Sequence, residues 1–262
     1  MVLLPLYTEK YKGVIFSGAE VTLNKQLPEF VSYAKSLGFR NIRIQTNGRR
    51  LSDLRKVRQL QLAGVNEFFV SFHAAQETIS KKITRRANAL HETTQALENL
   101  DRLGLKVITN TVMVSLNYKT LPQIARFLLK FKNIKAMEFW GYVPMSSDRG
   151  ELMLPYVLAA PYLNEALKIL RDKRREARVK YFPTCLLTGD HKKYLDNDQP
   201  VHLKMTKDAF RSKWRACDFQ KCEACGDEYC KGLPVIYRQS GEFEIMKKKK
   251  EAGYGYHHQA PI

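Results

Sequence analysis

Short apolar runs and helix-like stretches alternate five times along this chain, and this alternation limits its folds more than any other feature. The runs have the length of strands and are rich in β-branched and aromatic residues, whereas the stretches between them carry apolar residues at helical spacing. Several helix-like stretches end at a glycine, as helices commonly do. The expected strands are residues 13–16, 41–48, 67–74, 106–114 and 134–143, with a short closing strand at 179–182. The expected helices are residues 27–38, 53–63, 89–103, 121–131 and 160–177.

Strands that alternate with helices through short connections favour right-handed crossovers and a parallel sheet. An α/β fold of this kind, whether open or closed into a barrel, binds ligands at the carboxyl ends of its strands. Several of those ends carry small, polar or amide residues, which together predict a polar ligand at one rim. They are Ser17, Gly18, Ala19 and Glu20 after the first strand, Asn47 after the second, Ser71 and His73 at the third, and Asn110 in the fourth.

The most specific of these strand ends is the stretch Gly13–Glu20. Its first half is typical of a strand that is buried on both faces. In its second half, Gly18 lets a ligand approach the backbone, and the carboxylate of Glu20 suits a ligand that carries an amine. Taken alone, the stretch also fits an ordinary strand-to-loop turn, just as His73 alone fits an ordinary rim residue.

The net charge and the hydropathy limit which binding partners and which cellular compartment are expected. Lys and Arg outnumber Asp and Glu by 44 to 26, which gives a net charge of +18 and makes nucleic acid a partner to consider. The basic residues are scattered through most helical stretches, however, and such runs are usually solvated helix faces. No apolar run approaches the ~20 residues of a membrane span, and the first residues lack a signal sequence. We therefore expect a cytoplasmic protein with no membrane partner.

A cluster of cysteines follows the last expected strand. Four of the five cysteines lie within fourteen residues, with a Cys-x2-Cys pair at the centre, which is a signature of a metal site. Disulfides fit a cytoplasmic chain poorly. Thiolates at this spacing suit tetrahedral zinc or an iron–sulfur cluster, and the spacing does not choose between them. The candidate ligands are Cys185, Cys217, Cys222, Cys225 and Cys230.

These motifs together resemble the radical S-adenosylmethionine (radical SAM) superfamily, and more closely a branch with a C-terminal cysteine cluster. Gly18-Ala19-Glu20 is similar to the Gly-Gly-Glu motif of that family. The stretches 46–50 (Thr-Asn-Gly-Arg-Arg), 71–74 (Ser-Phe-His-Ala) and 110–112 (Asn-Thr-Val) resemble further strand-end motifs, and the late cysteines resemble its C-terminal motif. The resemblance covers nearly the whole chain, from Gly13 to Gly232.

The resemblance implies a partial (β/α)6 TIM-like barrel over residues 1–183 that binds S-adenosylmethionine through Glu20, Ser71 and Asn110. It also implies a [4Fe–4S] cluster and a Cys-rich auxiliary metal or cluster region over residues 184–246. The composition of residues 247–262 predicts a basic, disordered tail. The diagnostic Cys-x3-Cys-x2-Cys loop of the family is absent from the sequence, and Ala19 replaces the second glycine. We therefore expect the first β/α unit to be missing.

Three hypotheses for the function follow. The first is a radical SAM enzyme, incomplete or inactive as this chain, that acts on an unknown peptide or small molecule. The second is a non-catalytic radical-SAM-like paralogue with a metal site in its tail. The third is a basic, metal-stapled nucleic-acid-binding protein, whose affinity would fall steeply with salt.

Overall fold

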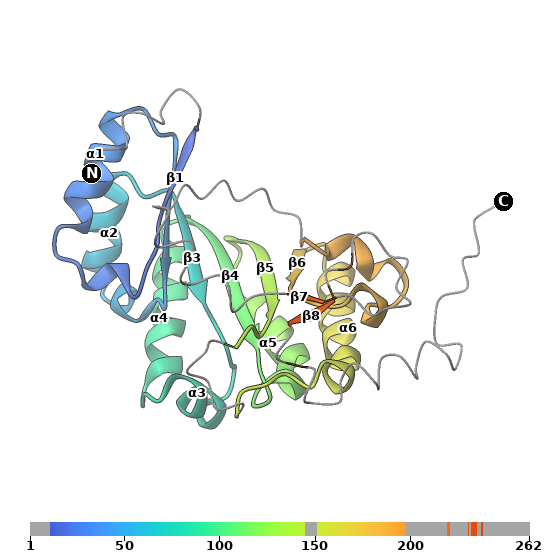
Figure 1. Cartoon of the computed structure of the whole chain (residues 1–262). Coiled ribbons are helices and arrows are strands. Elements are labelled where there is room, and N and C mark those ends of the chain that lie inside the picture. The colour runs from blue at the N-terminus through green and yellow to red at the C-terminus, as the bar shows by residue number, and fades with distance from the viewer. Residues whose placement is uncertain are drawn as a thin grey trace.

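The structure is a computed structural model, and it describes residues 11–144, 151–196, 219–220, 230, 232–234 and 237 (Figure 1). Six strands form one parallel sheet in the order of the sequence, from β1 to β6. A short antiparallel pair, β7 and β8, forms a second sheet. The strands are β1 (Gly13–Phe16), β2 (Asn41–Thr46), β3 (Glu67–Ser71), β4 (Lys106–Met113), β5 (Ile134–Gly141), β6 (Glu176–Lys180), β7 (Phe219–Gln220) and β8 (Leu233–Pro234).

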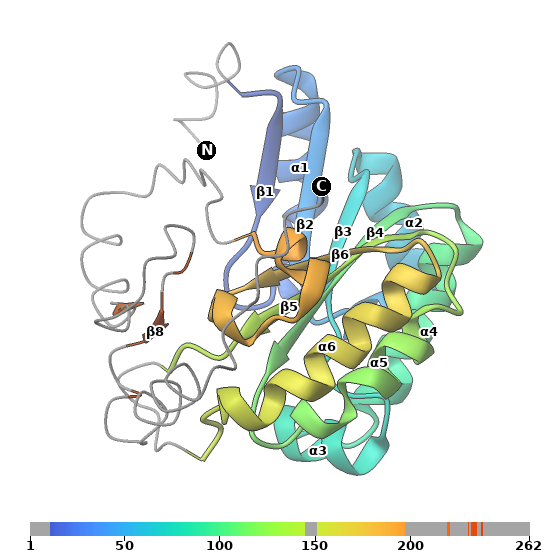
Figure 2. The same cartoon turned by 90° about the vertical axis from the view of Figure 1, so that its right-hand side faces the viewer.

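The α-helices follow the strands and lie along one face of the curved six-stranded sheet (Figure 2). This arrangement is the α/β fold of a partial (β/α) barrel, as the sequence predicts. No helix in the described part of the chain is long and apolar enough to cross a bilayer. The α-helices are α1 (Leu27–Ser36), α2 (Leu54–Ala63), α3 (Glu77–Thr84), α4 (Ala89–Arg102), α5 (Leu121–Leu128) and α6 (Tyr156–Asp172). The short 3-10 helices are η2 (Val21–Leu23), η3 (Arg49–Ser52), η4 (Tyr118–Thr120), η5 (Thr184–Leu186) and η6 (Gly189–Tyr194).

Alternation along the strands builds the main core on the helix-covered face of the sheet. In β2, Ile42 and Ile44 are buried in that core, and Phe68 and Val70 of β3 lie beside them. Because successive side chains of a strand point to opposite faces, the residues between them belong to the other face. There Phe69, Ile108 and Ala136 form a small second cluster.

Ion pairs flank this second cluster on the same face of the sheet. Glu67 pairs with Arg43 and Lys106, which are its register neighbours on β2 and β4. Toward the other end of the strands, the carboxylate of Glu138, which is 2% exposed, pairs with Arg178 at 3.2 Å. It also accepts a hydrogen bond from the indole Nε1 of Trp140 at 2.8 Å. The face opposite the α-helices, which is the inner face of the curved sheet, is therefore polar at both ends and apolar in the middle.

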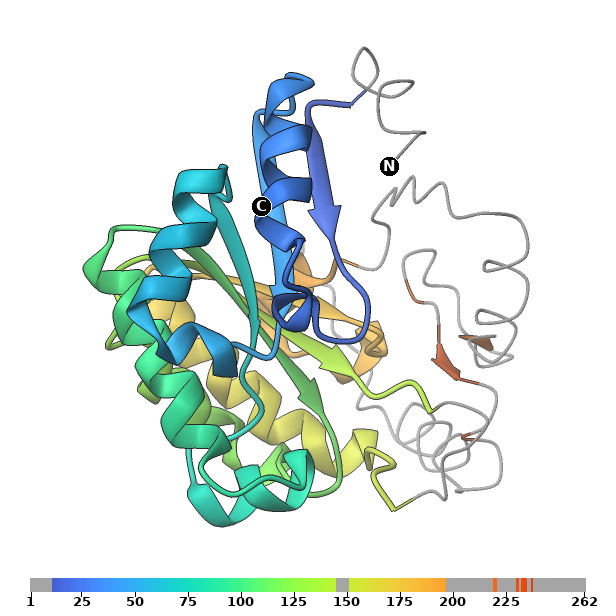
Figure 3. The same ribbon diagram turned by 90° about the vertical axis from the view of Figure 1, so that its left-hand side faces the viewer.

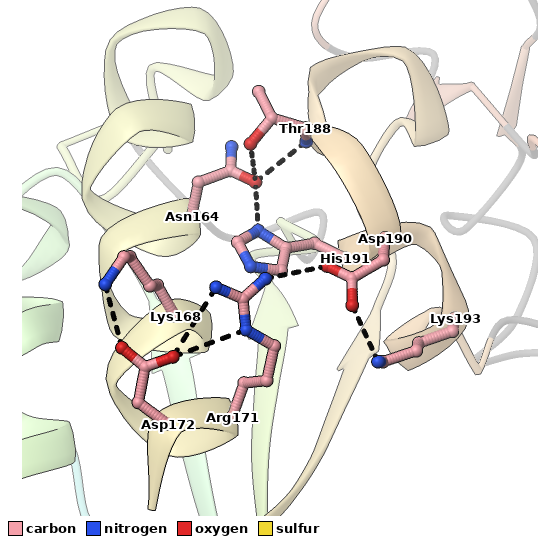
Figure 4. A network of polar contacts seen from close by, with 8 residues as sticks. All are labelled: Asn164, Lys168, Arg171, Asp172, Thr188, Asp190, His191 and Lys193. Carbon is pink, nitrogen blue, oxygen red and sulfur yellow. Dashed lines mark hydrogen bonds and ion pairs between the residues drawn. The ribbon is translucent and has the colours of Figure 1, made fainter. Parts of the chain in front are cut away.

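The last helix is tied to the segment after the sheet by one buried amide (Figure 4). Asn164 of α6 accepts hydrogen bonds from Thr188 N at 2.9 Å and from His191 Nδ1 at 2.9 Å. The same side chain donates to the carbonyl of Leu186 at 2.9 Å. Surface ion pairs of Arg171 with Asp190 and Asp172 surround the amide. Asn164 therefore fastens η5 and η6 against α6.

Three expectations about the elements are wrong. β1 is not buried on both faces, since Gly13 and Ile15 are exposed, Ile15 by 44%. The helix expected over 160–177 starts earlier and ends at Asp172, because Arg174 adopts a left-handed conformation (φ 51°) and the chain then enters β6. The helix α3 was not expected at all, since its apolar residues are too few to mark a period.

Candidate functional site

The predicted site residues follow strands whose carboxyl ends meet at one edge of the sheet. Figure 3 shows the arrowhead of β1 pointing toward the end of the molecule at which α3 lies. Parallel register places Ser71 of β3 directly beside Asn110 of β4. The rim therefore gathers residues from four strands, as the alternation of elements predicts.

A pocket of about 780 Å³ opens at this rim. Four of the residues predicted from the sequence line it, namely Glu20, Asn47, Ser71 and His73. Sequence reasoning missed the basic residues of the same pocket, although two of them, Arg49 and Arg50, directly follow the Asn47-Gly48 turn. Arg49 is paired with Glu92 of α4, whereas Arg50 and Arg86 are exposed. The lining also includes the apolar residues Leu23, Ile83 and Leu90.

The carboxylate of Glu20 is held in place by four hydrogen bonds. Its Oε1 accepts from the amide of Thr22 at 3.1 Å, from the hydroxyl of Thr22 at 2.6 Å and from the hydroxyl of Thr46 at 2.7 Å. Its Oε2 accepts from the backbone amide of Asn47 at 2.7 Å. A carboxylate oxygen has two acceptor sites, so Oε2 keeps capacity for a donor from a ligand. Glu20 is therefore a fixed carboxylate with acceptor capacity left over.

The backbone before Glu20 requires glycine at one position and tolerates alanine at the next. Gly18 has φ 153°, a conformation that side chains rarely adopt, and a Cβ there would meet no atom within 4 Å. Ala19 is not among the residues with positive φ. Because alanine is unfavourable only where φ is positive, replacing the family's second glycine by Ala19 costs no backbone strain.

His73 lines the pocket as a neutral ring. Its Nδ1 accepts a hydrogen bond from the backbone amide of Val112 at 3.2 Å. Burial lowers the pKa of His73 from 6.5 to about 4, so the imidazole carries no charge at neutral pH. Its backbone carbonyl accepts from Nδ2 of Asn117 at 2.9 Å, which fixes the turn that follows β3.

The side-chain oxygen of Asn110 is a buried acceptor that receives no hydrogen bond. The residue is 6% exposed, and its Oδ1 has no hydrogen-bond partner in the structure. Buried polar atoms are nearly always hydrogen-bonded, so an orphaned acceptor calls for an explanation. A ligand hydroxyl or amine would satisfy it. Asn110 does not line the pocket itself, whereas its register neighbour Ser71 does. Glu20 and Asn110 thus suit a ligand with amine and hydroxyl groups, which S-adenosylmethionine has.

The remaining predicted rim residues lie at the exposed tip of β1. Ser17 donates from its hydroxyl to Oε1 of Gln45 at 2.5 Å, which joins the tips of β1 and β2. Ser17, Gly18 and Ala19 are all exposed beside the pocket residue Glu20. The structure therefore brings the predicted rim residues to one edge, and their contact with a ligand stays a prediction.

The predicted metal site falls mostly outside the described residues. Cys217, Cys222 and Cys225 lie outside them, whereas Cys185 is exposed in η5 and Cys230 is buried. Among the residues that the structure describes, no group of three or more His, Cys, Asp or Glu side chains could hold a metal ion. The described residues therefore do not fit an iron–sulfur cluster, and the cysteine ligands stay a prediction.

The part of the chain that builds the rim pocket is also the part that matches a known family. The family model described as "Radical SAM superfamily" matches residues 4–128, which contain β1 to β4 and all of the rim pocket. The chain therefore carries a radical SAM domain over residues 4–128. Members of this superfamily use S-adenosylmethionine and a [4Fe–4S] cluster.

Curated relatives of this radical SAM chain act on different molecules. It is 29% identical over 178 residues to Fe-coproporphyrin III synthase of Methanosarcina barkeri, an alignment that covers 68% of this chain and 43% of the relative. It is also 29% identical over 122 residues to a probable GTP 3',8-cyclase of Sulfolobus acidocaldarius, covering 47% of this chain and 36% of the relative. The chain thus spans less than half the length of these relatives.

Solved structures share the fold of the radical SAM chain. Streptococcus suis SuiB bound to S-adenosylmethionine has a TM-score of 0.58 at 14% identity, over 68% of this chain and 42% of that one. The structure of anSMEcpe with bound AdoMet and Kp18Cys peptide has a TM-score of 0.53 at 14% identity, over 68% of this chain and 54% of that one. At such low identity, these likenesses support the partial barrel fold alone.

Proposed function

We propose that the rim pocket binds S-adenosylmethionine and that the protein serves radical chemistry on a substrate that is still unidentified. The observation that carries this proposal is the fixed carboxylate of Glu20 at the pocket, next to the open backbone at Gly18. When bound together, S-adenosylmethionine and a [4Fe–4S] cluster supply the radical chemistry. The residues of this chain bind and orient the cofactor.

Each rim residue has a role that its hydrogen bonds allow. Oε2 of Glu20 accepts from the methionyl amine, because that oxygen keeps an acceptor site. Oδ1 of Asn110 accepts from a ribose hydroxyl, which would satisfy its orphaned lone pairs. Ser71 is the register neighbour of Asn110 and lines the pocket, so its hydroxyl lies within the same region.

Binding can be tested without any cluster, by calorimetric titration of the chain with S-adenosylmethionine. Glu20→Gln removes the charge that attracts the amine, and we expect an affinity at least about tenfold lower, since hydrogen bonds to charged groups are the stronger ones. Glu29→Gln is the matched control, because Glu29 is exposed on α1 and is not part of the pocket. No heat with the unmodified chain, or equal affinity for both variants, would remove the proposal.

We further propose that this chain binds the cofactor but does not cleave it by itself. The 262 residues contain no Cys-x3-Cys-x2-Cys sequence, and their described part offers no cluster site. After anaerobic reconstitution with iron and sulfide and addition of a strong reductant, we expect no 5′-deoxyadenosine above the level of a protein-free sample. Formation of 5′-deoxyadenosine that depends on the protein would contradict this second proposal and leave the binding proposal intact.

A further inference from the structure

The hydrogen bonds around His73 fix which of its nitrogens carries the proton. Nδ1 accepts the amide of Val112 at 3.2 Å, so the proton of the neutral ring is on Nε2. The strand register of β3 and β4 sets this contact, because Ser71 pairs with Asn110, and these two residues lie two positions before His73 and Val112. The second ring nitrogen of His73, Nε2, is therefore an N–H donor.

This tautomer excludes two common roles of histidine at the pocket. A general base or a metal ligand needs a free lone pair on the ring nitrogen that does not contact Val112, and Nε2 has none. The ring also stays uncharged, since burial lowers its pKa to about 4. Within the described part of the chain, no hydrogen bond from Nε2 is found. His73 is thus a neutral donor that lines the pocket and has no acceptor of its own.

Two guanidinium groups of the same pocket also have no anionic partner. Arg49 is neutralised by Glu92, but neither Arg50 nor Arg86 forms an ion pair within the described residues. Arg50 belongs to η3, which follows the left-handed turn at Gly48 (φ 79°). Arg86 follows the left-handed end of α3, where its amide donates to Oγ1 of Thr84 at 3.3 Å.

These unpaired donors share one ligand chemistry. Guanidinium groups bind carboxylates and phosphates through paired N–H donors, and a neutral imidazole N–H adds a donor without adding charge. The fixed carboxylate of Glu20 belongs to the same pocket but comes from a different strand end. The pocket therefore combines a place for a cation with a place for an anion.

We propose that the rim pocket contains an oxyanion site, in which Nε2–H of His73 and the guanidinium groups of Arg50 and Arg86 bind a carboxylate or a phosphate. This inference rests on the pocket of the proposed function and names the chemistry of its second end. The anion has two sources that share this chemistry. It is either the carboxylate of S-adenosylmethionine or an anionic group of a separate substrate.

Two substitutions separate the acceptor function of the His73 ring at Nδ1 from its donor function at Nε2. His73→Asn places an oxygen near the position of Nδ1, so it keeps an acceptor for Val112 and removes the donor at Nε2. His73→Gln reaches the position of Nε2 with an amide N–H and gives up the contact with Val112. His91→Asn is the control, because His91 is exposed on α4 outside the pocket. Thermal melts establish that each variant is folded.

Calorimetric titrations with S-adenosylmethionine, with its decarboxylated analogue and with inorganic phosphate test the site. If the cofactor supplies the anion, His73→Asn lowers affinity for S-adenosylmethionine about tenfold, the analogue is unaffected, and His73→Gln retains most of the affinity. If a substrate supplies it, phosphate binds alongside S-adenosylmethionine, and His73→Asn weakens phosphate alone. Both results support an oxyanion site and identify its source.

The double variant Arg50→Gln with Arg86→Gln should weaken the same ligand, whereas Arg58→Gln, on the exposed face of α2, should not. The proposal is overturned if His73→Asn and the double arginine variant both leave all three titrations unchanged. Its failure can be told apart from failure of the proposed function. If S-adenosylmethionine does not bind at all, phosphate binding that depends on His73 still supports the oxyanion site.

Discussion

Glu20 accepts a hydrogen bond from the backbone amide of Asn47 at 2.7 Å, and this contact joins the tips of two neighbouring strands. Thr46, immediately before Asn47, donates to the other oxygen of the same carboxylate. The carboxylate therefore both closes the rim between β1 and β2 and faces the pocket. Stability and ligand binding should respond together when these contacts are removed.

Thr46→Val tests this coupling. The change removes the donor to Glu20 and the acceptor that the Gly48 amide uses at 3.0 Å, at a residue that is 5% exposed. We expect the free energy of unfolding to fall by about 1–3 kcal/mol, and affinity for S-adenosylmethionine to fall with it. Urea denaturation and calorimetry measure the two effects. Thr46→Ser keeps the hydroxyl and should restore most of both, and failure to do so would argue against the hydrogen bonds as the cause.

Gly48→Ala should disturb the turn that positions Arg50. Gly48 has φ 79°, and an added Cβ would lie 2.9 Å from Cγ1 of Val70. We expect a loss of about 1–3 kcal/mol in the free energy of unfolding, from backbone strain together with this close contact. Gly104→Ala is the matched control, since Gly104 has φ 67° but no atom within 4 Å of an added Cβ. Equal losses for both variants would mean that the contact with Val70 contributes nothing.

Glu138→Gln should destabilise the inner face of the sheet. The substitution removes the negative charge that Arg178 and Lys180 face at 3.2 and 3.5 Å in a nearly fully buried position. Breaking a buried ion pair on one side typically costs about 3–5 kcal/mol, and chemical denaturation measures this loss. Glu176→Gln, which removes an exposed partner of Arg178, should cost less than about 1 kcal/mol. A small effect at Glu138 would show that the remaining partners of these cations compensate.

Stability should fall in mild acid because of His73. Its pKa is about 4 in the folded protein and 6.5 ordinarily, so the unfolded chain binds the proton first as pH falls. The contribution of His73 is complete above about pH 6.5 and is lost progressively toward pH 4. His191 acts in the same direction, since burial lowers its pKa as well. Denaturation curves of the unmodified chain and of His73→Asn between pH 7.5 and 4.5 should converge as pH falls, whereas parallel curves would contradict the assigned ring state.

Metal analysis tests the late cysteines. After anaerobic incubation with iron, sulfide and zinc, we expect one zinc ion or one cluster per chain. The double variant Cys222→Ala with Cys225→Ala should lose it, because the central Cys-x2-Cys pair supplies two of the thiolates. Cys185→Ala shows whether Cys185, which is exposed in η5, is also a ligand of the metal. Full metal content in the double variant would remove the tail site.

The order of strands and helices and the position of the rim followed from the sequence alone. Apolar periodicity reports which face of an element is buried, and parallel strands bring their carboxyl ends together without further information. The sequence therefore sufficed to predict that Glu20, Asn47, Ser71 and His73 share one rim. It gave no signal for α3, whose few apolar residues mark no period.

Tertiary structure alone decided what these side chains can do. The partners of Glu20 include Thr46 and Asn47, and the proton position on His73 is set by Val112, which lies 39 residues later in the chain. Hydrogen bonds between residues so far apart depend on strand register, and no local pattern encodes that register. The sequence thus determined which residues reach the rim, whereas the fold determined which of their lone pairs and protons remain available to a ligand.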